Sequence, residues 1–167
     1  MSNSARTILL DDFTSSLNDL FQCYSGEVLE LTEEASPTFE PTYSASIGFG
    51  TEKIRGSVVL LTDAKSADKI WGDSTNTLSD WLGELANQVV GRFKNKVAEC
   101  GVLINMGLPT AIYGKDINVE ADDYQMWQTQ AAGCHFATVL KLAIDEDLEL
   151  QRDPNLSSAE EGSLCLF

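Results

Sequence analysis

The most constraining feature of this 167-residue chain is the pattern of apolar side chains between Thr77 and Cys100. They recur mostly every three or four residues, as they do along one face of an α-helix. The apolar positions are Leu78, Leu82, Leu85, Ala86, Val89, Phe93 and Val97. Gly101 follows directly, and glycine commonly ends a helix. We therefore expect one long helix over residues 77–100, with a broad face packed against a core.

The other side of this expected helix is a narrow polar line. At about 100° per residue, Asp80, Glu84, Asn87 and Gly91 fall within an arc of about 60°. Glycine inside a helix costs about 1 kcal/mol relative to alanine, so its presence at position 91 calls for an explanation. Gly91 either leaves room for another molecule to approach, contacts another element of its own fold, or is merely tolerated.

A second long helix is expected near the start of the chain. Apolar residues at helical spacing indicate a helix over residues 6–24, with Gly26 placed to end it. Asp63 can cap a short helix that reaches about Trp71.

The remaining patterned segments indicate strands. Extended segments are expected at residues 27–32, 43–48, 54–62, 102–106, 111–113, 126–132 and 135–143. Gly48–Gly50 is expected to form the hairpin connection between the second and third of them. Because the strands occur in runs instead of alternating with helices, we expect an α+β fold with an antiparallel-rich sheet packed against two long helices.

Composition limits the classes of function. Hydrophobic residues make up 43% of the chain, which is enough for the core of a single globular domain. The formal net charge of −15 would repel nucleic acid and anionic membrane surfaces, so we expect neither partner. We place the domain at residues 1–150 and expect residues 151–167 to be a loosely ordered acidic tail.

The sequence carries no targeting or membrane-spanning pattern. Its apolar run Ile8–Leu10 is too short for a signal peptide, and no stretch approaches the ~20 apolar residues that span a bilayer. Cys23, Cys100, Cys134 and Cys165 are widely separated, and with a single histidine they predict no metal site. We interpret them as reduced, mostly buried thiols of a cytoplasmic protein without membrane insertion.

The negative charge is unevenly distributed. Residues 1–75 have a balance of −7, from 5 basic and 12 acidic side chains, and residues 116–167 have −9, from 2 and 11. Residues 76–115 carry 4 basic and 3 acidic side chains, a balance of +1. The basic residues Arg92, Lys94 and Lys96 follow the polar line in this segment, so it is the part of the surface that an acidic partner could approach.

The polar line lies in the stretch DWLGELANQVVG, and LPTAIYG follows downstream. Together these stretches resemble the signature of the CheX/CheC/FliY family of chemotaxis phosphatases, and of its CheX branch in particular. That signature has an Asp or Ser, a Glu four residues later, an Asn three residues further on, and a proline well downstream. Asp80, Glu84, Asn87 and Pro109 occupy these places, and Gly91 matches a glycine that commonly follows the Asn.

The resemblance implies an enzyme that hydrolyses the aspartyl phosphate of a CheY-like response-regulator receiver. The receiver's own carboxylates hold Mg²⁺, so the chain needs no cofactor or metal of its own. Asn87 would orient the attacking water, because an amide donates and accepts hydrogen bonds without titrating. Glu84, on the same helix face, would pair with the receiver's lysine. The other positions expected to contact the partner are Asp80, Gly91, Arg92 and Pro109.

The likeness extends from the first expected helix to about Gly114 and fits a CheC-like fold. A single Glu-x-x-Asn element favours the CheX branch, which implies a homodimer with one site per subunit. Two features depart from the family's pattern: the interval of 21 residues between Asn87 and Pro109, and the pair Arg92-Phe93 after Gly91. These departures favour the alternative, a non-catalytic module that binds or scaffolds a receiver in two-component signalling.

Two other groupings of reactive residues do not match the pattern of a functional site. The acidic run from Asp116 imitates a calcium loop, but Ala121 replaces the turn glycine and Trp127 replaces the final Glu. Cys134 and His135 are neighbours in an expected strand, so their side chains should point to opposite faces of the sheet. Neither grouping predicts a site.

Overall fold

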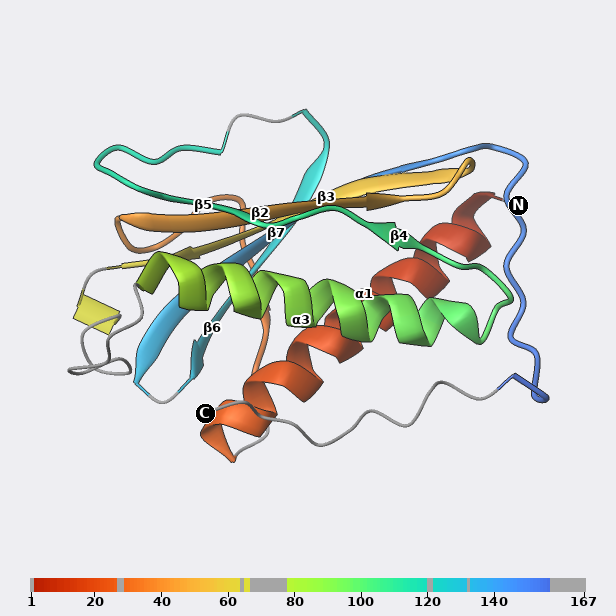
Figure 1. Ribbon diagram of the computed structural model, residues 1–167, viewed down its shortest axis with the longest axis horizontal. Coiled ribbons are helices and arrows are strands. Elements are labelled where there is room, and N and C mark those ends of the chain that lie inside the picture. Colours follow the sequence, from red (N-terminus) through yellow and green to blue (C-terminus); the bar gives the residue numbers. More distant parts are fainter. Residues whose placement is uncertain are drawn as a thin grey trace.

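The computed structural model describes residues 2–26, 29–63, 65–66, 78–119, 122–131 and 133–156. In this part of the chain, two long helices cover one face of a single antiparallel sheet (Figure 1). The expected α+β class, with its antiparallel sheet and two long helices, is confirmed.

The sheet has seven strands within the described residues, and every pair of neighbouring strands is antiparallel. The order across the sheet is β1 (Thr32–Glu33), β6 (Tyr124–Ala131), β7 (Cys134–Ile144), β3 (Ile54–Thr62), β2 (Tyr43–Gly50) and β4 (Asn105–Met106). A further strand, β5 (Thr110–Tyr113), pairs with the other end of β2. The edge opposite β1 is therefore shared by β4 and β5.

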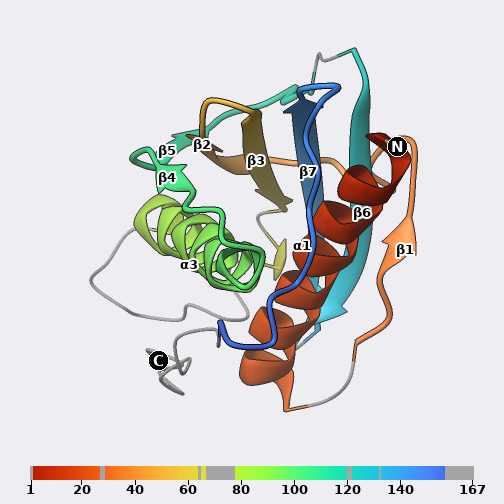
Figure 2. The ribbon, with the colours of Figure 1, turned by 90° about the vertical axis from the view of Figure 1, so that its right-hand side faces the viewer.

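The two helices are α1 (Ser2–Ser25) and α3 (Leu78–Ala98). Figure 2 shows α3 beside the edge formed by β4 and β5, and α1 in front of β7 and β6. Gly26 directly follows α1, as predicted, whereas α3 ends at Ala98 and Gly101 closes the turn that follows it; the two glycines have φ angles of 71° and 74°. This left-handed conformation is open to glycine without a steric cost.

Aromatic rings join the helices to each other and to the sheet. Phe13 of α1 meets Phe93 of α3 edge-on, with ring centroids 5.6 Å apart. Phe93 meets Phe49 of β2 with centroids 5.4 Å apart, and all three rings are buried. Because edge-to-face contacts fix the relative orientation of rings, this packing sets which side of α3 faces solvent.

The hairpin of β2 and β3 differs from its predicted form. Gly48–Gly50 belongs to β2 and does not form the connection, which runs through residues 51–53 and is closed by a hydrogen bond from Thr51 N to Ile54 O (2.6 Å). A side chain on Gly56 of β3 would overlap the ring of Phe49. The glycine-rich run therefore belongs to the closely packed ladder of the hairpin.

Two predicted strands are shorter than expected. The segment predicted at residues 27–32 contributes only Thr32, which forms β1 with Glu33; residues 27–28 lie outside the described part of the chain. Leu29 and Leu31 instead pack against the core as partly buried side chains. Of residues 102–106, only Asn105–Met106 pairs with β2. A strand forms only where another strand is placed to pair with it, and the local sequence pattern does not show where that partner lies.

The segment after β3 begins as predicted. Ser66 N donates a hydrogen bond to Asp63 Oδ1 (2.6 Å), the contact expected of a helix-capping aspartate. Residues 67–77, which include Trp71 and the expected start of the long helix at Thr77, lie outside the described residues.

The thiols differ from the prediction at one position. Cys100 and Cys134 are free, and Cys134 is buried, as predicted. Cys23 is exposed at the end of α1 and is disulfide-bonded, so the interpretation of this residue as a buried thiol was wrong. Cys165 lies outside the described residues.

The chain continues past β7 along the ends of the two helices. Leu148 and Leu150 are buried there, whereas residues 151–156, the first part of the expected tail, are exposed. Residues 157–167 lie outside the described residues. Among the described residues, no helix combines the length and the apolar character needed to cross a membrane.

Three charged residues tie this segment to both helices. Arg152 pairs with Asp12 of α1 and, at 2.9 Å, with Glu99 just after α3. The backbone N–H of Asp153 donates to the carbonyl oxygen of Glu99 (2.9 Å). Burial raises the pKa of Asp12, although Arg152 opposes this shift. We call Asp12, Glu99 and Arg152 the ionic clasp.

Candidate functional site

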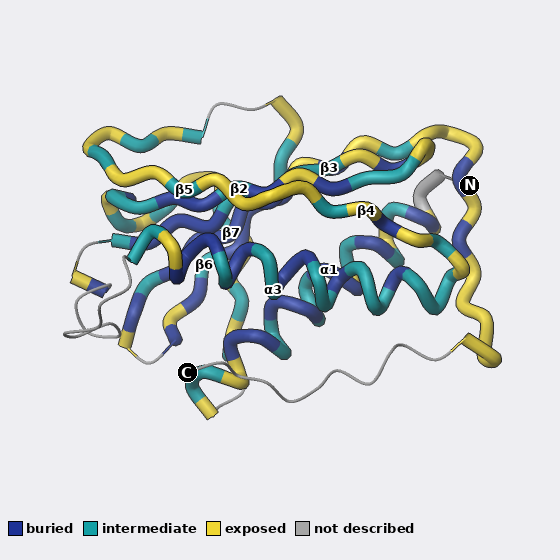
Figure 3. The backbone as a smooth tube through the Cα atoms, in the orientation of Figure 1, coloured by how far each residue is buried: buried dark blue, intermediate teal, exposed yellow. Residues whose placement is uncertain are grey.

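The polar residues of α3 face solvent. Asp80 is exposed, and Glu84, Asn87 and Gly91 are partly exposed. Along α3, partly exposed and buried stretches alternate, as on a helix with one side in the core (Figure 3). The buried residues of the helix are Trp81, Leu82, Gly83, Leu85, Ala86, Val89, Val90, Phe93 and Val97. We call Asp80, Glu84, Asn87 and Gly91 the exposed line.

Pro109 lies beside the exposed line, although it comes from the loop between β4 and β5. A methyl group on Gly83 of α3 would lie 3.7 Å from Pro109 Cβ. The loop is also held on the sheet, because Gly107 N donates to Gly48 O (2.8 Å). Pro109 therefore packs over Gly83, the residue that precedes Glu84 on the helix. Its neighbour Leu108, which the sequence did not single out, is 89% exposed.

The open surface at Gly91 excludes one of the three explanations for a glycine at this helical position. A methyl group there would meet no atom within 4 Å among the described residues, leaving out the helix's own backbone. Gly91 is therefore not required by contact with another element of its own fold in that part of the chain. The helical glycine that does face another element is Gly83, under Pro109.

Tyr24, at the end of α1, flanks the other side of the exposed line. Its hydroxyl donates to Gln88 Oε1 (3.5 Å), and Gln88 Nε2 donates to Glu84 Oε1 (3.4 Å). Burial raises the pKa of Tyr24 to about 12; the Glu84 charge acts in the same direction, and the Gln88 hydrogen bond and Arg92 oppose it. Both Tyr24 and Gln88 were missed in the sequence. Only Gln88 carries a local signal, its position four residues after Glu84.

The basic residues after the exposed line have different surroundings. Arg92 is partly exposed, and its guanidinium donates to Cys23 Sγ (3.8 Å) at the end of α1. Lys96 forms an ion pair with Asp19 of α1 (2.9 Å). Of these two cations, Arg92 lies nearer the exposed line, and Lys96 is engaged within the fold.

The other groupings behave as expected from the strand pattern. Cys134 is buried in the core beside the helices, and its thiol donates to Ser66 O (2.8 Å). The ring of His135 instead contacts Phe39, with centroids 5.9 Å apart. The two side chains therefore point to opposite faces of β7, as predicted. No group of three or more His, Cys, Asp or Glu side chains able to hold a metal ion occurs among the described residues.

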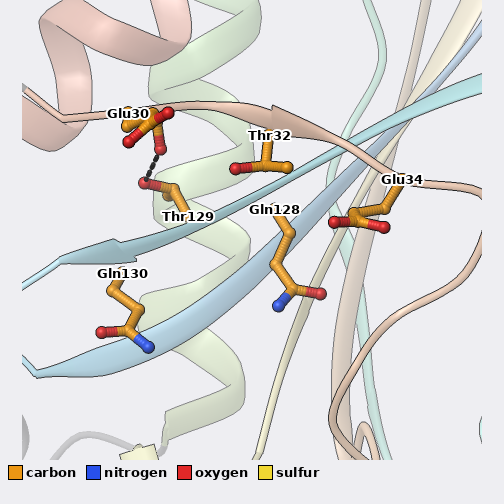
Figure 4. A pocket seen from close by; sticks show the side chains of 6 residues that line it. All are labelled: Glu30, Thr32, Glu34, Gln128, Thr129 and Gln130. Atoms are coloured by element: carbon orange, nitrogen blue, oxygen red, sulfur yellow. Dashed lines mark hydrogen bonds between the residues drawn. The ribbon is translucent and has the colours of Figure 1, made fainter.

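A polar hollow of about 310 Å³ lies at the opposite edge of the sheet (Figure 4). Its walls come from β1, β6 and the residues next to β1, and Thr129 Oγ1 donates to the backbone oxygen of Glu30 (3.0 Å). The hollow contains none of the residues singled out in the sequence. The exposed line lies on α3 beside the edge formed by β4 and β5, and the hollow lies at the β1 edge, so the two are separate features.

The side chains of the exposed line can position a water molecule and a partner's charged group by hydrogen bonding. Asn87 offers an amide that both donates and accepts hydrogen bonds, and Glu84 offers a carboxylate one turn away on the same face. The sequence and the structure place both groups toward solvent, with Pro109 at the rim. Such a surface can order a water molecule and engage a cation on an approaching molecule.

Comparison with known proteins identifies relatives of this arrangement. The family model described as chemotaxis phosphatase CheX matches residues 43–131, which is over half of the chain and includes both the exposed line and Pro109. No curated protein sequence matches the chain at a significant level.

Solved structures share the fold at low sequence identity. The chain is similar to the chemotaxis protein CheX from Vibrio vulnificus, with a TM-score of 0.66, 18% identity, and coverage of 80% of this chain and 98% of that chain. A chemotactic CheC-like protein from Shewanella oneidensis gives a TM-score of 0.67 at 14% identity, covering 82% and 99%. The CheX–CheY–BeF₃–Mg²⁺ complex from Borrelia burgdorferi gives 0.60 at 17% identity, covering 82% and 96%. The predicted CheC-like fold is confirmed.

Proposed function

The chain belongs to the CheX family of chemotaxis phosphatases, and from this premise we propose that it hydrolyses the aspartyl phosphate of a CheY-like receiver. The observation that carries the proposal is the exposed line: a carboxylate and an amide, Glu84 and Asn87, face solvent one turn apart on a helix whose other side is core. The structure of a Borrelia burgdorferi CheX in complex with CheY, BeF₃ and Mg²⁺ supports a receiver as the partner.

In the proposed reaction, Asn87 supplies the catalytic contact. The acyl phosphate of a receiver is intrinsically reactive, so its hydrolysis is accelerated mainly by placing water in line with the phosphorus. The Asn87 amide can accept a hydrogen bond from that water and donate one to a phosphoryl oxygen. Mg²⁺ belongs to the receiver, and this chain contributes no metal ligand to the mechanism.

Glu84 sets the register of the complex. We assign its carboxylate to the lysine of the receiver site, because a charge-assisted hydrogen bond fixes position as well as adding affinity. Asp80 lies one turn earlier as an edge contact, and the open surface at Gly91 admits the partner closely. Pro109 forms the rim, held over α3 at Gly83.

Charge favours approach at this face. A receiver presents an acidic phosphorylation pocket, which the overall charge of −15 would repel. Arg92 stands just beyond Gly91 in the segment whose balance is +1, so the docking face is the least repulsive part of the chain for an acidic partner.

We also propose that the chain forms a homodimer through the sheet edge at β5. Among the described residues β5 pairs with β2 alone, and its Ile112 and Tyr113 are 57% and 69% exposed. An exposed strand edge with apolar side chains is a template for pairing with another strand. Sedimentation at micromolar concentration should give the mass of two chains, and a monomer alone would contradict this assignment.

The alternative is a receiver-binding scaffold without catalysis, which the unusual Arg92-Phe93 pair favours. The experiment that separates the two follows the phosphate on a purified CheY-like receiver with and without the wild-type protein, and measures binding in parallel. The proposal predicts a shortened phosphate lifetime. Binding with an unchanged lifetime would establish the scaffold instead, and absence of binding would reject that receiver as the partner.

A further inference from the structure

We infer that Gln88 and Tyr24, two residues outside the Glu-x-x-Asn pattern, are positioning residues that hold the Glu84 carboxylate ready for the receiver. The inference rests on the proposed function, because it names how the docking carboxylate is oriented. Its basis is the chain of two hydrogen bonds from Tyr24 to Gln88 and from Gln88 to Glu84.

The charge of Glu84 fixes the direction of this chain. An ionised carboxylate can only accept hydrogen bonds, so the group of Gln88 that faces Glu84 must be the Nε2 amide. The Oε1 atom of Gln88 then faces Tyr24 and needs a donor, which the phenol hydroxyl supplies at 3.5 Å. The phenol, the amide and the carboxylate therefore form one hydrogen-bonded chain with a consistent donor direction.

Tyr24 can serve as the fixed end because the core holds its ring. The ring lies edge-on to Trp81, with centroids 6.4 Å apart, and Trp81 is 3% exposed. Within the described part of the chain, the charged groups that act on the phenol are Glu84 and Arg92, one on each side of Gln88 along α3. The network therefore connects the end of α1 to the exposed line of α3.

The consequence for docking is pre-organisation. A glutamate on a helix surface samples several rotamers, and a partner that needs one of them must order the side chain on binding. Hydrogen bonding by Gln88 orders it beforehand. If Tyr24 cannot donate, the Gln88 amide is free to rotate and present Oε1 to the carboxylate, which would turn Glu84 away. Loss of either residue should therefore weaken receiver binding more than it slows hydrolysis of bound receiver.

The experiment compares Gln88→Met and Tyr24→Phe with Gln22→Met, a matched control on an exposed position of α1. Each protein is titrated with a beryllofluoride-activated receiver for affinity and with phosphorylated receiver for KM and kcat. We expect Gln88→Met and Tyr24→Phe to raise Kd and KM by about three- to tenfold, the range of a typical net hydrogen bond, with kcat within about twofold. The control should match the wild type in all three quantities and in melting temperature.

A double-mutant cycle separates positioning from general damage to the fold. In the Glu84→Ala background, Gln88→Met should produce no further change in Kd, because the group it positions is gone. An equal loss of affinity in both backgrounds, or wild-type Kd and KM in Tyr24→Phe, would overturn the inference. Because Kd is measured without hydrolysis, a wild-type protein that binds but does not shorten the phosphate lifetime would reject the enzyme and still test the network.

Discussion

The exposed line and the ionic clasp use charged residues on or beside the same helix in opposite ways. In the clasp, Asp12 is 3% exposed and pairs with Arg152, which also reaches Glu99. On the exposed line, Glu84 faces solvent and accepts a hydrogen bond of 3.4 Å from Gln88. One set of charges is engaged within the fold, and the other is directed outward.

This difference indicates where α3 serves stability and where it serves a partner. Charges that are desolvated must be paired, because an unpaired buried charge is strongly destabilising. Charged side chains that stay in water contribute little to the stability of the fold, so their type and position can be determined by binding to a partner. The clasp should therefore respond to mutation in stability, and the exposed line should respond in binding and catalysis.

The largest expected effect on stability comes from breaking the clasp. Asp12→Ala removes the buried carboxylate and its ion pair with Arg152, which keeps only its more exposed pair with Glu99 in the described structure; the free energy of unfolding should fall by about 2–3 kcal/mol. We place this below the full cost of a buried pair because the Arg152 side chain is 47% exposed. Urea unfolding measures the change, with the exposed neighbour Asp11→Ala as the control. Equal stabilities of the two variants would show that the clasp is not structural.

A charge reversal beside the exposed line should change binding without changing stability. Arg92→Glu places a negative charge toward an acidic partner, so receiver affinity should fall by about tenfold at low salt and depend less on salt. Arg55→Glu, an exposed position on β3, is the matched control. The measurement is the Kd for the receiver of both variants at several salt concentrations. If Arg92→Glu leaves the affinity and its salt dependence unchanged, Arg92 is not part of the docking face.

Replacing the open glycine should separate stability from binding most clearly. Gly91→Ala should raise the free energy of unfolding by about 0.5–1 kcal/mol, because alanine is a better helix former and the methyl group meets no atom within 4 Å in the described structure. The same methyl group should weaken receiver binding. Gly83→Ala, whose methyl group would rest on Pro109, is the comparison. A Gly91→Ala protein that is more stable and binds the receiver normally would mean that the glycine is merely tolerated.

The smallest effect concerns the ionisation of Tyr24. Its pKa is raised from 10.0 to about 12, so the native state keeps this proton to higher pH than the unfolded chain. The wild type should therefore lose stability relative to Tyr24→Phe as the pH rises from about 10 toward 12. The difference between the absorbance titrations of the two proteins isolates the Tyr24 phenol. A midpoint near 10 would show that the Tyr24 hydroxyl is solvated, because burial is the main cause of its raised pKa.

The exposed line could be predicted from sequence because it depends on helical geometry alone. A period of about 100° per residue places Asp80, Glu84, Asn87 and Gly91 together whatever the rest of the fold does. The end of α1 was also predictable, and that of α3 to within two residues, since Gly26 and Gly101 adopt the conformation that only glycine takes readily.

Features that depend on contacts between distant segments could not be predicted. Arg152 and Asp12 are 140 positions apart, and Tyr24 and Gln88 are 64 apart, so no local pattern indicates either pair. The same reason explains the short strand β1: of the described residues 29–32, only Thr32 pairs with β6, and the alternation of the sequence does not show this. Helical periodicity predicts that Gly83 lies on the core side of the helix, but it does not predict that Pro109 covers it.

The most direct test of the division between the two regions is the rate of receiver dephosphorylation by Asn87→Ala. Asn87 lies on the solvent side of α3, so the variant should unfold within about 0.5 kcal/mol of the wild type, as surface substitutions do. It should bind a beryllofluoride-activated receiver with nearly wild-type affinity and hydrolyse the aspartyl phosphate at saturation at least about 100-fold more slowly. A variant that retains the wild-type rate would contradict the assignment of Asn87 and with it the catalytic role of the exposed line.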